Sequence, residues 1–198
     1  MRKKKVLHVG CGPHGTEKLH ESFQGRDWEE LRLDINPDAR PDIVASITDM
    51  AAVPSGSCDA LYSSHNLEHL APHDLPLALG EFYRVLRPEG FALITLPDLE
   101  QAAEAIASGR AEEAVLMTNM GAITPLDILY GFRPLLAANP YMAHRFGYTA
   151  ATLEKALRQA GFGHVLVSRD GEFNLWAVVS PKSLASDADA ADEEKSDT

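Results

Sequence analysis

Three glycines lie close together directly behind a short apolar run near the start of the sequence. The stretch HVGCGPHG, residues 8–15, places Gly10, Gly12 and Gly15 after Val6–Val9, a run with the composition of a strand. Glycine tolerates positive φ and lets the backbone approach a ligand closely, so such a loop can hold a nucleotide. The spelling G-x-G-x-x-G is the pattern of dinucleotide-binding folds, which makes NAD one candidate ligand. A plain strand-to-helix turn is the alternative.

A carboxylate stands at the end of the next apolar run. Asp34 lies 19 positions after Gly15 and directly before Ile35, Asn36 and Pro37. An acid at the end of the second strand can accept hydrogen bonds from both hydroxyls of a ribose. Because NAD and S-adenosylmethionine both contain an adenosine ribose, Asp34 does not distinguish them. A turn-capping role before Asn36-Pro37 is the alternative.

A third group of polar residues has the spacing of metal ligands. His65, Glu68 and His69 spell H-x-x-E-H, and on a helix these positions share one face that could bind a metal ion. Pro72 cuts the segment short, which weakens the comparison with long-helix zinc sites. Without a metal, His65 is a candidate general base, because it follows a predicted strand.

The spacing of apolar residues predicts alternating strands and helices that would position these groups. We expect strands over 6–9, 28–33, 42–45, 59–62 and 91–96, and helices over 16–24, 74–86 and 149–160. Strands that alternate with helices indicate a parallel sheet with covered faces.

The end of the folded region predicts a hairpin. Val165–Ser168 and Phe173–Val179 flank Asp170-Gly171, a dipeptide typical of tight hairpin turns. The whole pattern therefore predicts an α/β fold: a Rossmann-like, seven-stranded, mostly parallel sheet with helices on both faces. We expect the hairpin to add one antiparallel strand at an edge of this sheet.

Residues 99–148 stand outside the alternation and contain Pro125, Pro134 and Pro140. We expect them to form a helical insertion between the fifth strand and the last helix. This insertion would cap the substrate at the carboxyl edge of the sheet, where open α/β sheets bind ligands. Residues 1–180 would form one domain, and residues 181–198, rich in Ala, Asp, Ser and Glu, an acidic disordered tail.

Composition narrows the function classes. The 198 residues are 45% hydrophobic, enough for the core of one domain, and the formal net charge is −11. An acidic chain argues against bulk binding of nucleic acid or of anionic membranes. No apolar run approaches the ~20 residues of a membrane span. The two cysteines, Cys11 and Cys58, have no paired spacing. We therefore expect a reduced, cytoplasmic setting, and the oligomeric state stays open.

Five motifs, in this order, resemble class I S-adenosylmethionine-dependent methyltransferases with a methyltransferase type 11-like domain. They are LHVGCG at 7–12, LDIN at 33–36, SITDM at 46–50, NLEHL at 66–70 and RVLRPEG at 84–90, and the resemblance resumes in FGYTAATLEKALRQAGF at 146–162. The resemblance implies an enzyme that transfers the methyl group of S-adenosylmethionine to an O or N atom of a small-molecule or saccharide-like acceptor. S-adenosylhomocysteine would be the product. A non-catalytic scaffold with the same fold is the alternative, and an NAD-dependent oxidoreductase the third.

Carried over by position, the resemblance implies a role for each motif. Gly10 and Gly12 would line the methionine and ribose of the cofactor, Asp34 would bind the ribose, and Asp49 would accept the adenine amino group. The full implied cofactor set is His8, Gly10, Cys11, Gly12, Asp34, Ile35, Thr48, Asp49, Met50 and Ser64. His8 departs from the family, which usually has an acid there, and an imidazolium would repel the ammonium group of the cofactor.

On the acceptor side, His65 would be the catalytic base, and the implied substrate-binding residues are Asn66, His69, Tyr141, His144 and Arg145. A similar slot holds metal ligands in some O-methyltransferases of the ubiquinone pathway and of small RNAs. This makes His65, Glu68, His69 and His144 an alternative metal set. Many relatives with LEHL bind no metal there, so the prediction is that the site holds none. The resemblance does not identify the acceptor.

Overall fold

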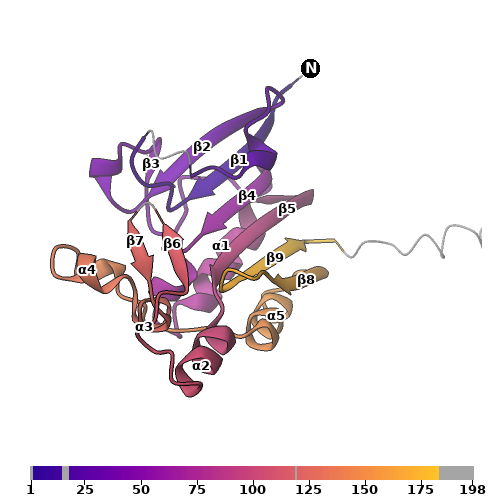
Figure 1. Ribbon diagram of the computed structural model, residues 1–198. Helices are drawn as coiled ribbons and strands as arrows, with labels where there is room; N and C mark the ends of the chain where they lie inside the picture. Colours follow the sequence, from indigo (N-terminus) through magenta and orange to yellow (C-terminus); the bar gives the residue numbers. More distant parts are fainter. Residues whose placement is uncertain (1, 15–17, 119, 183–198) are drawn as a thin grey trace, which may run out of the picture.

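A seven-stranded sheet forms the centre of the molecule in the computed structural model, which describes residues 2–14, 18–118 and 120–182 (Figure 1). Its strands follow the order β3-β2-β1-β4-β5-β9-β8. They are β1 (Lys4–Val9), β2 (Trp28–Asp34), β3 (Ile43–Val44), β4 (Cys58–Ser64), β5 (Leu86–Pro97), β8 (His164–Arg169) and β9 (Asn174–Ser180). All five strands predicted before the insertion and the terminal hairpin are confirmed.

The sheet has six parallel strands and one antiparallel strand, as predicted. β1, β2, β3, β4 and β5 pair in parallel, whereas β9 pairs antiparallel with both β5 and β8. The expected position of the antiparallel strand at an edge is wrong, because β9 lies between β5 and β8. The connection after β5 places β8 at the edge of the sheet, one strand position away from β5. The tight hairpin then places β9 between β5 and β8.

Alternation along the strands sends one set of side chains to the main core. Leu7 and Val9 of β1 pack there with Leu79 and Phe82 of α1 (Leu75–Val85) and with Leu153 of α5 (Ala150–Gln159). Helix α5 begins where predicted, with a capping box in which Thr149 and Thr152 each accept a hydrogen bond from the backbone of the other. Burial of these apolar side chains is the main favourable term in folding.

The opposite face of the sheet carries a smaller aromatic cluster. Val6, Ala60 and Tyr62 face Phe23, whose ring packs edge-on against Trp28 at 5.0 Å between centroids. The helix expected over 16–24 is wrong in the part that can be compared. Between residues 18 and 24 the structure has a 3-10 turn, Glu21–Phe23, and residues 15–17 lie outside the described chain. The ring of Phe23 packs on this face of the sheet, where the helix was expected.

The segment between β5 and α5 is folded but is not wholly helical. It contains α2 (Leu99–Ala107), α3 (Pro125–Tyr130) and α4 (Arg133–Leu136), and also a small hairpin of β6 (Leu116–Thr118) and β7 (Gly121–Ile123). Figure 1 shows these elements gathered beyond the carboxyl ends of β1, β4 and β5. The predicted acidic tail falls almost entirely on residues 183–198, outside the described chain. Within the described residues, no helix is both long and apolar enough to cross a membrane.

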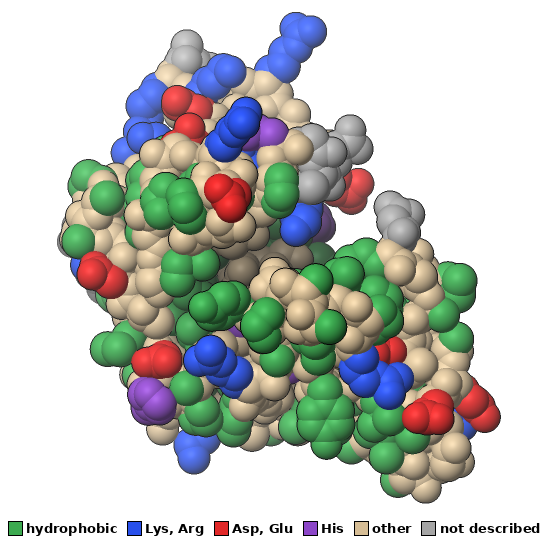
Figure 2. Space-filling model, turned by 90° about the vertical axis from the view of Figure 1, so that its left-hand side faces the viewer, with side chains coloured by type: hydrophobic (Ala, Val, Ile, Leu, Met, Phe, Trp, Pro, Cys, Tyr) green, Lys and Arg blue, Asp and Glu red, His purple; other side chains and the backbone are tan. Residues whose placement is uncertain are grey.

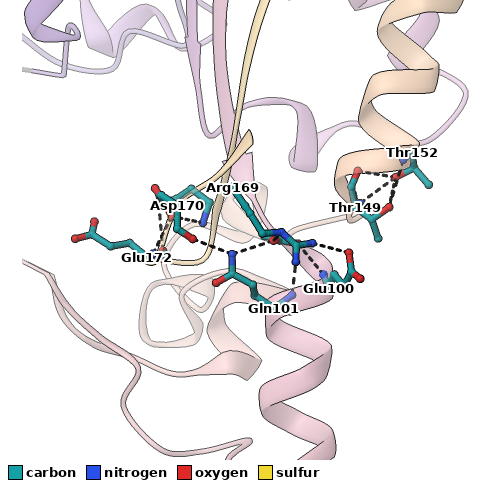
Figure 3. Close-up of polar contacts among 9 residues, drawn as sticks. Glu100, Gln101, Thr149, Thr152, Arg169, Asp170 and Glu172 are labelled. Atoms are coloured by element: carbon teal, nitrogen blue, oxygen red, sulfur yellow. Dashed lines mark hydrogen bonds and ion pairs between the residues drawn. The ribbon is translucent and has the colours of Figure 1, made fainter. Parts of the chain in front are cut away.

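Contacts between Arg169 of β8 and the first turn of α2 fix where the insertion leaves the sheet (Figure 3). Asp98, 0% exposed, caps α2 by accepting from the N–H of Glu100 and contacts Arg169 of β8 through Nε at 3.1 Å. Arg169 also donates to Glu100 at 2.6 Å, and Gln101 donates to Asp98 at 2.9 Å. These charge-assisted contacts tie the first turn of the insertion to the terminal hairpin.

A second acid, Asp127, holds α3 and α4 together. Its carboxylate accepts from Thr124 N–H at 2.9 Å, Thr124 hydroxyl at 2.7 Å and Arg133 Nε at 2.8 Å. Burial alone would raise the pKa of Asp127, but these donors outweigh it and lower the pKa to about 2. The ionised carboxylate is therefore much better accommodated in the folded protein than in the unfolded chain.

We expect Asp127→Asn to lower the free energy of unfolding at neutral pH by about 2 kcal/mol. A depressed pKa contributes stability above the unfolded value of 3.8, and this contribution is lost as pH falls from 3.8 toward 2. Urea unfolding at several pH values should therefore show the deficit of the variant shrinking below pH 4. Glu112→Gln is the matched control, because Glu112 also faces Arg133 but is 80% exposed. Equal deficits in both variants would contradict the assignment.

Candidate functional site

The glycine loop is held in a fixed shape by residues of β2. Gly10 and Gly12 both have positive φ, +60° and +64°. The N–H of Gly12 donates to Asp34 Oδ2 at 2.8 Å, and the guanidinium of Arg32 donates to the Gly12 carbonyl. The N–H of Cys11 donates to the carbonyl of Leu33 at 3.2 Å. The end of β2 therefore determines the curvature of the loop that follows β1.

Asn66 packs directly beneath the first glycine. Its side-chain amide donates to the Val9 carbonyl at 3.0 Å and to Ser63 Oγ at 3.1 Å. A Cβ on Gly10 would lie only 1.8 Å from Asn66 Oδ1, so no other residue fits without displacing this amide. Asn66 was predicted to bind substrate, and the structure gives it a supporting role under the loop.

The residues predicted to hold ribose and adenine lie at the same sheet edge. Asp34 uses its two oxygens on Gly12 N–H and Asn36 N–H, and each oxygen retains a second lone pair. Ile35 is 71% exposed, a flat apolar surface beside that carboxylate. Asp49 is exposed and Thr48 half-buried in the turn after β3. Met50 is the exception: its side chain is 0% exposed in the main core, where it cannot reach an adenine.

His8 does not point toward the loop in the way the sequence suggested. It lies on the aromatic face, 2% exposed, with Nδ1 at 2.7 Å from Glu30 of β2 and its ring against Tyr62. Burial lowers the pKa of His8, although Glu30 opposes the shift, so the ring is favoured in its neutral form. The position where the resemblance implies an acid thus carries an imidazole that favours its neutral form and already has a carboxylate partner.

The insertion docks on the turn that follows β4. That turn, the 3-10 segment Leu67–His69, presents the backbone carbonyl of Glu68, which accepts from Arg145 N–H at 2.7 Å and Phe146 N–H at 3.2 Å. The N–H of His144 donates to the Tyr130 carbonyl at 3.1 Å. Glu68 is thereby placed beside residues that lie 77 and 78 positions further along the chain.

Two histidines face one another across this contact. His69 Nδ1 lies 3.1 Å from the Ala143 carbonyl, and His144 Nδ1 lies 2.8 Å from the Ile128 carbonyl. The ring centroids are 5.1 Å apart. Because a carbonyl only accepts, each Nδ1 carries a proton, and in the neutral form of either ring the lone pair is on Nε2. The structure thus brings together His69 and His144, two residues predicted for the acceptor side.

Glu68 sits beneath these rings with its carboxylate buried. The side chain is 1% exposed, and neither oxygen has a hydrogen-bond partner among the described residues. Burial opposes ionisation, but His65, His69 and His144 outweigh it and lower the pKa of Glu68. Burial lowers the pKa of His144. The cluster therefore combines an anionic carboxylate with a neutral imidazole.

His65 stands beside this cluster in a strained conformation. Its φ is +54°, uncommon for a residue with a side chain, and its Nδ1 is 3.3 Å from Glu68 Oε1. Burial alone would lower the pKa of His65, and the contact with Glu68 raises it above its ordinary value. Strain of this kind concentrates at functional sites. The side chain is 49% exposed, which is compatible with its predicted role as a base.

Figure 2 shows a hollow between the upper and lower parts of the molecule in that view, with hydrophobic side chains along its border. The insertion leaves several large apolar side chains exposed: Met117, Met120, Tyr130, Leu135, Tyr141, Met142 and Phe146. Tyr141 is 79% exposed and Arg145 is exposed, so both predicted acceptor residues are accessible. Ser64, predicted on the cofactor side, is half-buried at the end of β4.

Sequence reasoning missed Arg32 and Glu30, which support the loop and His8. Both lie in β2, where Arg32 pairs with His8 in register and is 7% exposed. Part of a signal was present, because period-two alternation places residues 30 and 32 on one face of the strand, but only the register of β1 against β2 places His8 on that face. Charged residues on a strand face that also carries a buried histidine indicate a polar network.

Comparison with known proteins identifies the domain. Residues 7–94 match the family model described as a methyltransferase domain. The sequence matches no curated protein. The match confirms the predicted resemblance and the predicted class of enzyme.

Solved structures share the fold. A Pyrococcus horikoshii protein has a TM-score of 0.62 at 16% identity, covering 91% of this chain and 83% of that one. A SAM-dependent methyltransferase from Archaeoglobus fulgidus has a TM-score of 0.57 at 17% identity, covering 89% and 86%. A Burkholderia thailandensis 1,6-didemethyltoxoflavin-N1-methyltransferase, solved with S-adenosylhomocysteine, has a TM-score of 0.51 at 15% identity, covering 91% and 72%. These likenesses confirm the predicted Rossmann-like fold class.

Replacing Gly10 should disturb the loop and its support together. We expect Gly10→Ala to lower the free energy of unfolding by about 2–3 kcal/mol, because alanine is disfavoured at φ +60° and its Cβ displaces the Asn66 amide. Urea unfolding measures the loss. Gly25→Ala is the control, since a Cβ at Gly25 meets nothing within 4 Å. If the two variants lose equal stability, Asn66 does not buttress the loop.

Proposed function

We propose that this chain, which carries a methyltransferase domain over residues 7–94, transfers the methyl group of S-adenosylmethionine to an O or N atom of a small-molecule acceptor. The observation that carries the proposal is the arrangement at the carboxyl edge of the sheet. A rigid glycine loop and Asp34 stand on one side, and the His65–Glu68–His69–His144 cluster stands on the other.

The cofactor side follows from the geometry of the loop. Positive φ at Gly10 and Gly12 removes side chains where the methionine and ribose would lie, and Asp34 keeps lone pairs for the ribose hydroxyls. Ile35 offers an apolar surface next to the ribose, and Asp49 is the exposed acceptor suited to an adenine amino group. Cys11 contributes its backbone only, because its side chain is buried.

The reaction itself needs orientation more than acid–base chemistry. The acceptor atom attacks the methyl carbon in line with the departing sulfur, a new C–O or C–N bond forms, and S-adenosylhomocysteine leaves as the neutral thioether. Holding two reactants in line converts a bimolecular step into an effectively unimolecular one. His65 remains the candidate to accept the proton of a hydroxyl or amine, since it is half-exposed beside the cluster.

The border of the hollow supports an acceptor with an apolar body. Tyr130, Tyr141 and Phe146 are 55%, 79% and 43% exposed, and exposed aromatic side chains on one element group typically mark a binding surface. An aromatic ring or the apolar face of a saccharide could stack on them. Arg145, exposed next to Phe146, would suit an acceptor that also carries an acidic group.

Cofactor binding can be tested without knowing the acceptor. At about 100 times its dissociation constant, S-adenosylhomocysteine should stabilise the protein by about 2.7 kcal/mol and raise the melting temperature by roughly 5–10 °C. NADH at the same concentration should leave it unchanged. Thermal denaturation monitored by circular dichroism gives both shifts. The reverse pattern would favour the oxidoreductase, and no shift at millimolar S-adenosylmethionine or S-adenosylhomocysteine would favour the non-catalytic scaffold.

The same experiment tests Asp34. We expect Asp34→Ala to abolish the shift, because the ribose loses its acceptor and the Gly12 N–H loses its partner. Asp34→Asn keeps one acceptor oxygen and the shape of the loop, and should retain only a small part of the shift. Asp38→Ala, an exposed acid four residues away, is the control and should respond like the wild type. An unchanged shift in Asp34→Ala would remove Asp34 from the ribose site.

A further inference from the structure

The most unusual feature outside the cofactor side is the Glu68 carboxylate. It is buried at 1% exposure, and neither oxygen has a hydrogen-bond partner among the described residues. Proteins rarely bury a carboxylate without satisfying it, because the charge loses its hydration and gains nothing in return. His65 Nδ1, 3.3 Å from Oε1, offsets part of this cost, and the second oxygen remains for a further group.

The neighbours of Glu68 are not arranged to complete it by hydrogen bonds. His144 Nε2 lies 4.0 Å from Glu68 Oε1, beyond hydrogen-bond range. His69 and His144 use Nδ1 on backbone carbonyls, which leaves the Nε2 atom of each ring for another partner, and His144 Nε2 lies on the side of the carboxylate. Anchoring of Nδ1 by a carbonyl, with Nε2 left free, is how proteins orient histidines that bind metals.

The spacing of these atoms is close to that of ligands around one small cation. One ligand atom from each of Glu68, His69 and His144 lies within 4.8 Å of the other two. A tetrahedral divalent ion with bonds of about 2.0–2.2 Å holds its ligand atoms roughly 3.5 Å apart, so the side chains must rotate inward by about an ångström to close the site. His65 is outside this set, because its Nδ1 contacts Glu68 at 3.3 Å and its ring does not share the common centre.

We propose that Glu68, His69 and His144 bind one divalent transition-metal ion, with His65 positioning the carboxylate. Two imidazoles and one carboxylate are the donor set of several catalytic zinc sites and suit first-row ions such as Zn²⁺ and Co²⁺. Mg²⁺ and Ca²⁺ prefer oxygen ligands and should bind poorly. The sequence predicted no metal ion, and its alternative metal set counted His65 as a fourth ligand. The proposed site differs from both, because it holds an ion with three ligands and without His65.

The three side chains leave coordination positions free on a bound ion. If the proposed function holds, on which this step rests, an oxygen or nitrogen atom of the methyl acceptor would occupy one of these free coordination positions. Catalytic metal sites characteristically keep such an open position for water or substrate. The acceptor class thereby narrows to molecules with a hydroxyl, carboxylate or nitrogen ligand next to an apolar body.

Zinc binding by the full chain, stripped of metal and free of any affinity tag, tests the site. Isothermal titration with ZnCl₂ should give one ion per chain for the wild type. Affinity should fall at least ~100-fold in Glu68→Gln and His144→Ala, since each removes a direct ligand. His73→Ala is the control: its side chain is 82% exposed and contacts only Asp74, so affinity should stay unchanged. Co²⁺ should give a visible absorption band with the wild type and with His73→Ala, but not with Glu68→Gln or His144→Ala.

Glu68→Gln keeps the test decisive if His144→Ala does not fold. Glutamine keeps the shape of the side chain and an oxygen for the contact with His65, so metal-free Glu68→Gln should fold with a melting temperature close to that of the wild type. Zn²⁺ should then raise the melting temperature of the wild type only, and millimolar Mg²⁺ should not reproduce the shift. A lower melting temperature in metal-free Glu68→Gln, with no effect of Zn²⁺ on the wild type, would show a purely structural Glu68–His65 pair and overturn the proposal. Equal zinc affinity in all four proteins would overturn it too.

The outcome is separable from that of the proposed function. A protein that binds Zn²⁺ but neither S-adenosylmethionine nor S-adenosylhomocysteine would keep the metal site and overturn methyl transfer. A protein that binds S-adenosylhomocysteine but no Zn²⁺ would overturn the metal site alone.

Discussion

The site depends on one contact: the backbone carbonyl of Glu68 accepts the N–H groups of both Arg145 and Phe146. This contact fixes the returning end of the insertion against the turn after β4. The N–H of His144 and its Nδ1 are held at the same time by carbonyls of Tyr130 and Ile128. Without this docking, the acceptor side would consist of a half-exposed turn, and His144 would have no reason to lie near Glu68.

The glycine loop is also held by hydrogen bonds between its backbone and residues distant in the sequence. Asp34 accepts a hydrogen bond from the Gly12 N–H, and Arg32 donates one to the Gly12 carbonyl. The Asn66 amide donates one to the Val9 carbonyl. Because Asn66 directly precedes the turn that carries Glu68, the cofactor loop and the acceptor cluster share one short segment. A change at Gly10 is therefore expected to be felt on the acceptor side through Asn66.

Local rules are broken at several residues of the proposed site. His65 adopts a positive φ without being glycine, and neither oxygen of the buried Glu68 carboxylate has a hydrogen-bond partner among the described residues. The buried hydroxyl of Tyr148 also has none there, and burial together with the Glu68 charge raises the pKa of Tyr148 to about 12. Such conflict is expected where function, not stability, selects the residues, but it is not confined to the site, since Arg40 and Phe173 also have positive φ.

The sequence by itself determined the strands, their alternation with α1 and α5, the terminal hairpin and the motifs of a methyltransferase domain. These features arise from local periodicity and turn chemistry, and both can be read from a single sequence. Only the tertiary structure decided that β9 lies inside the sheet, that Met50 belongs to the core and that His8 pairs with Glu30. It alone joined His144 to Glu68 and His69, because that meeting depends on how a 50-residue insertion folds back. Long-range contacts of this kind leave no periodic trace in the sequence, and they decide which side chains face one another.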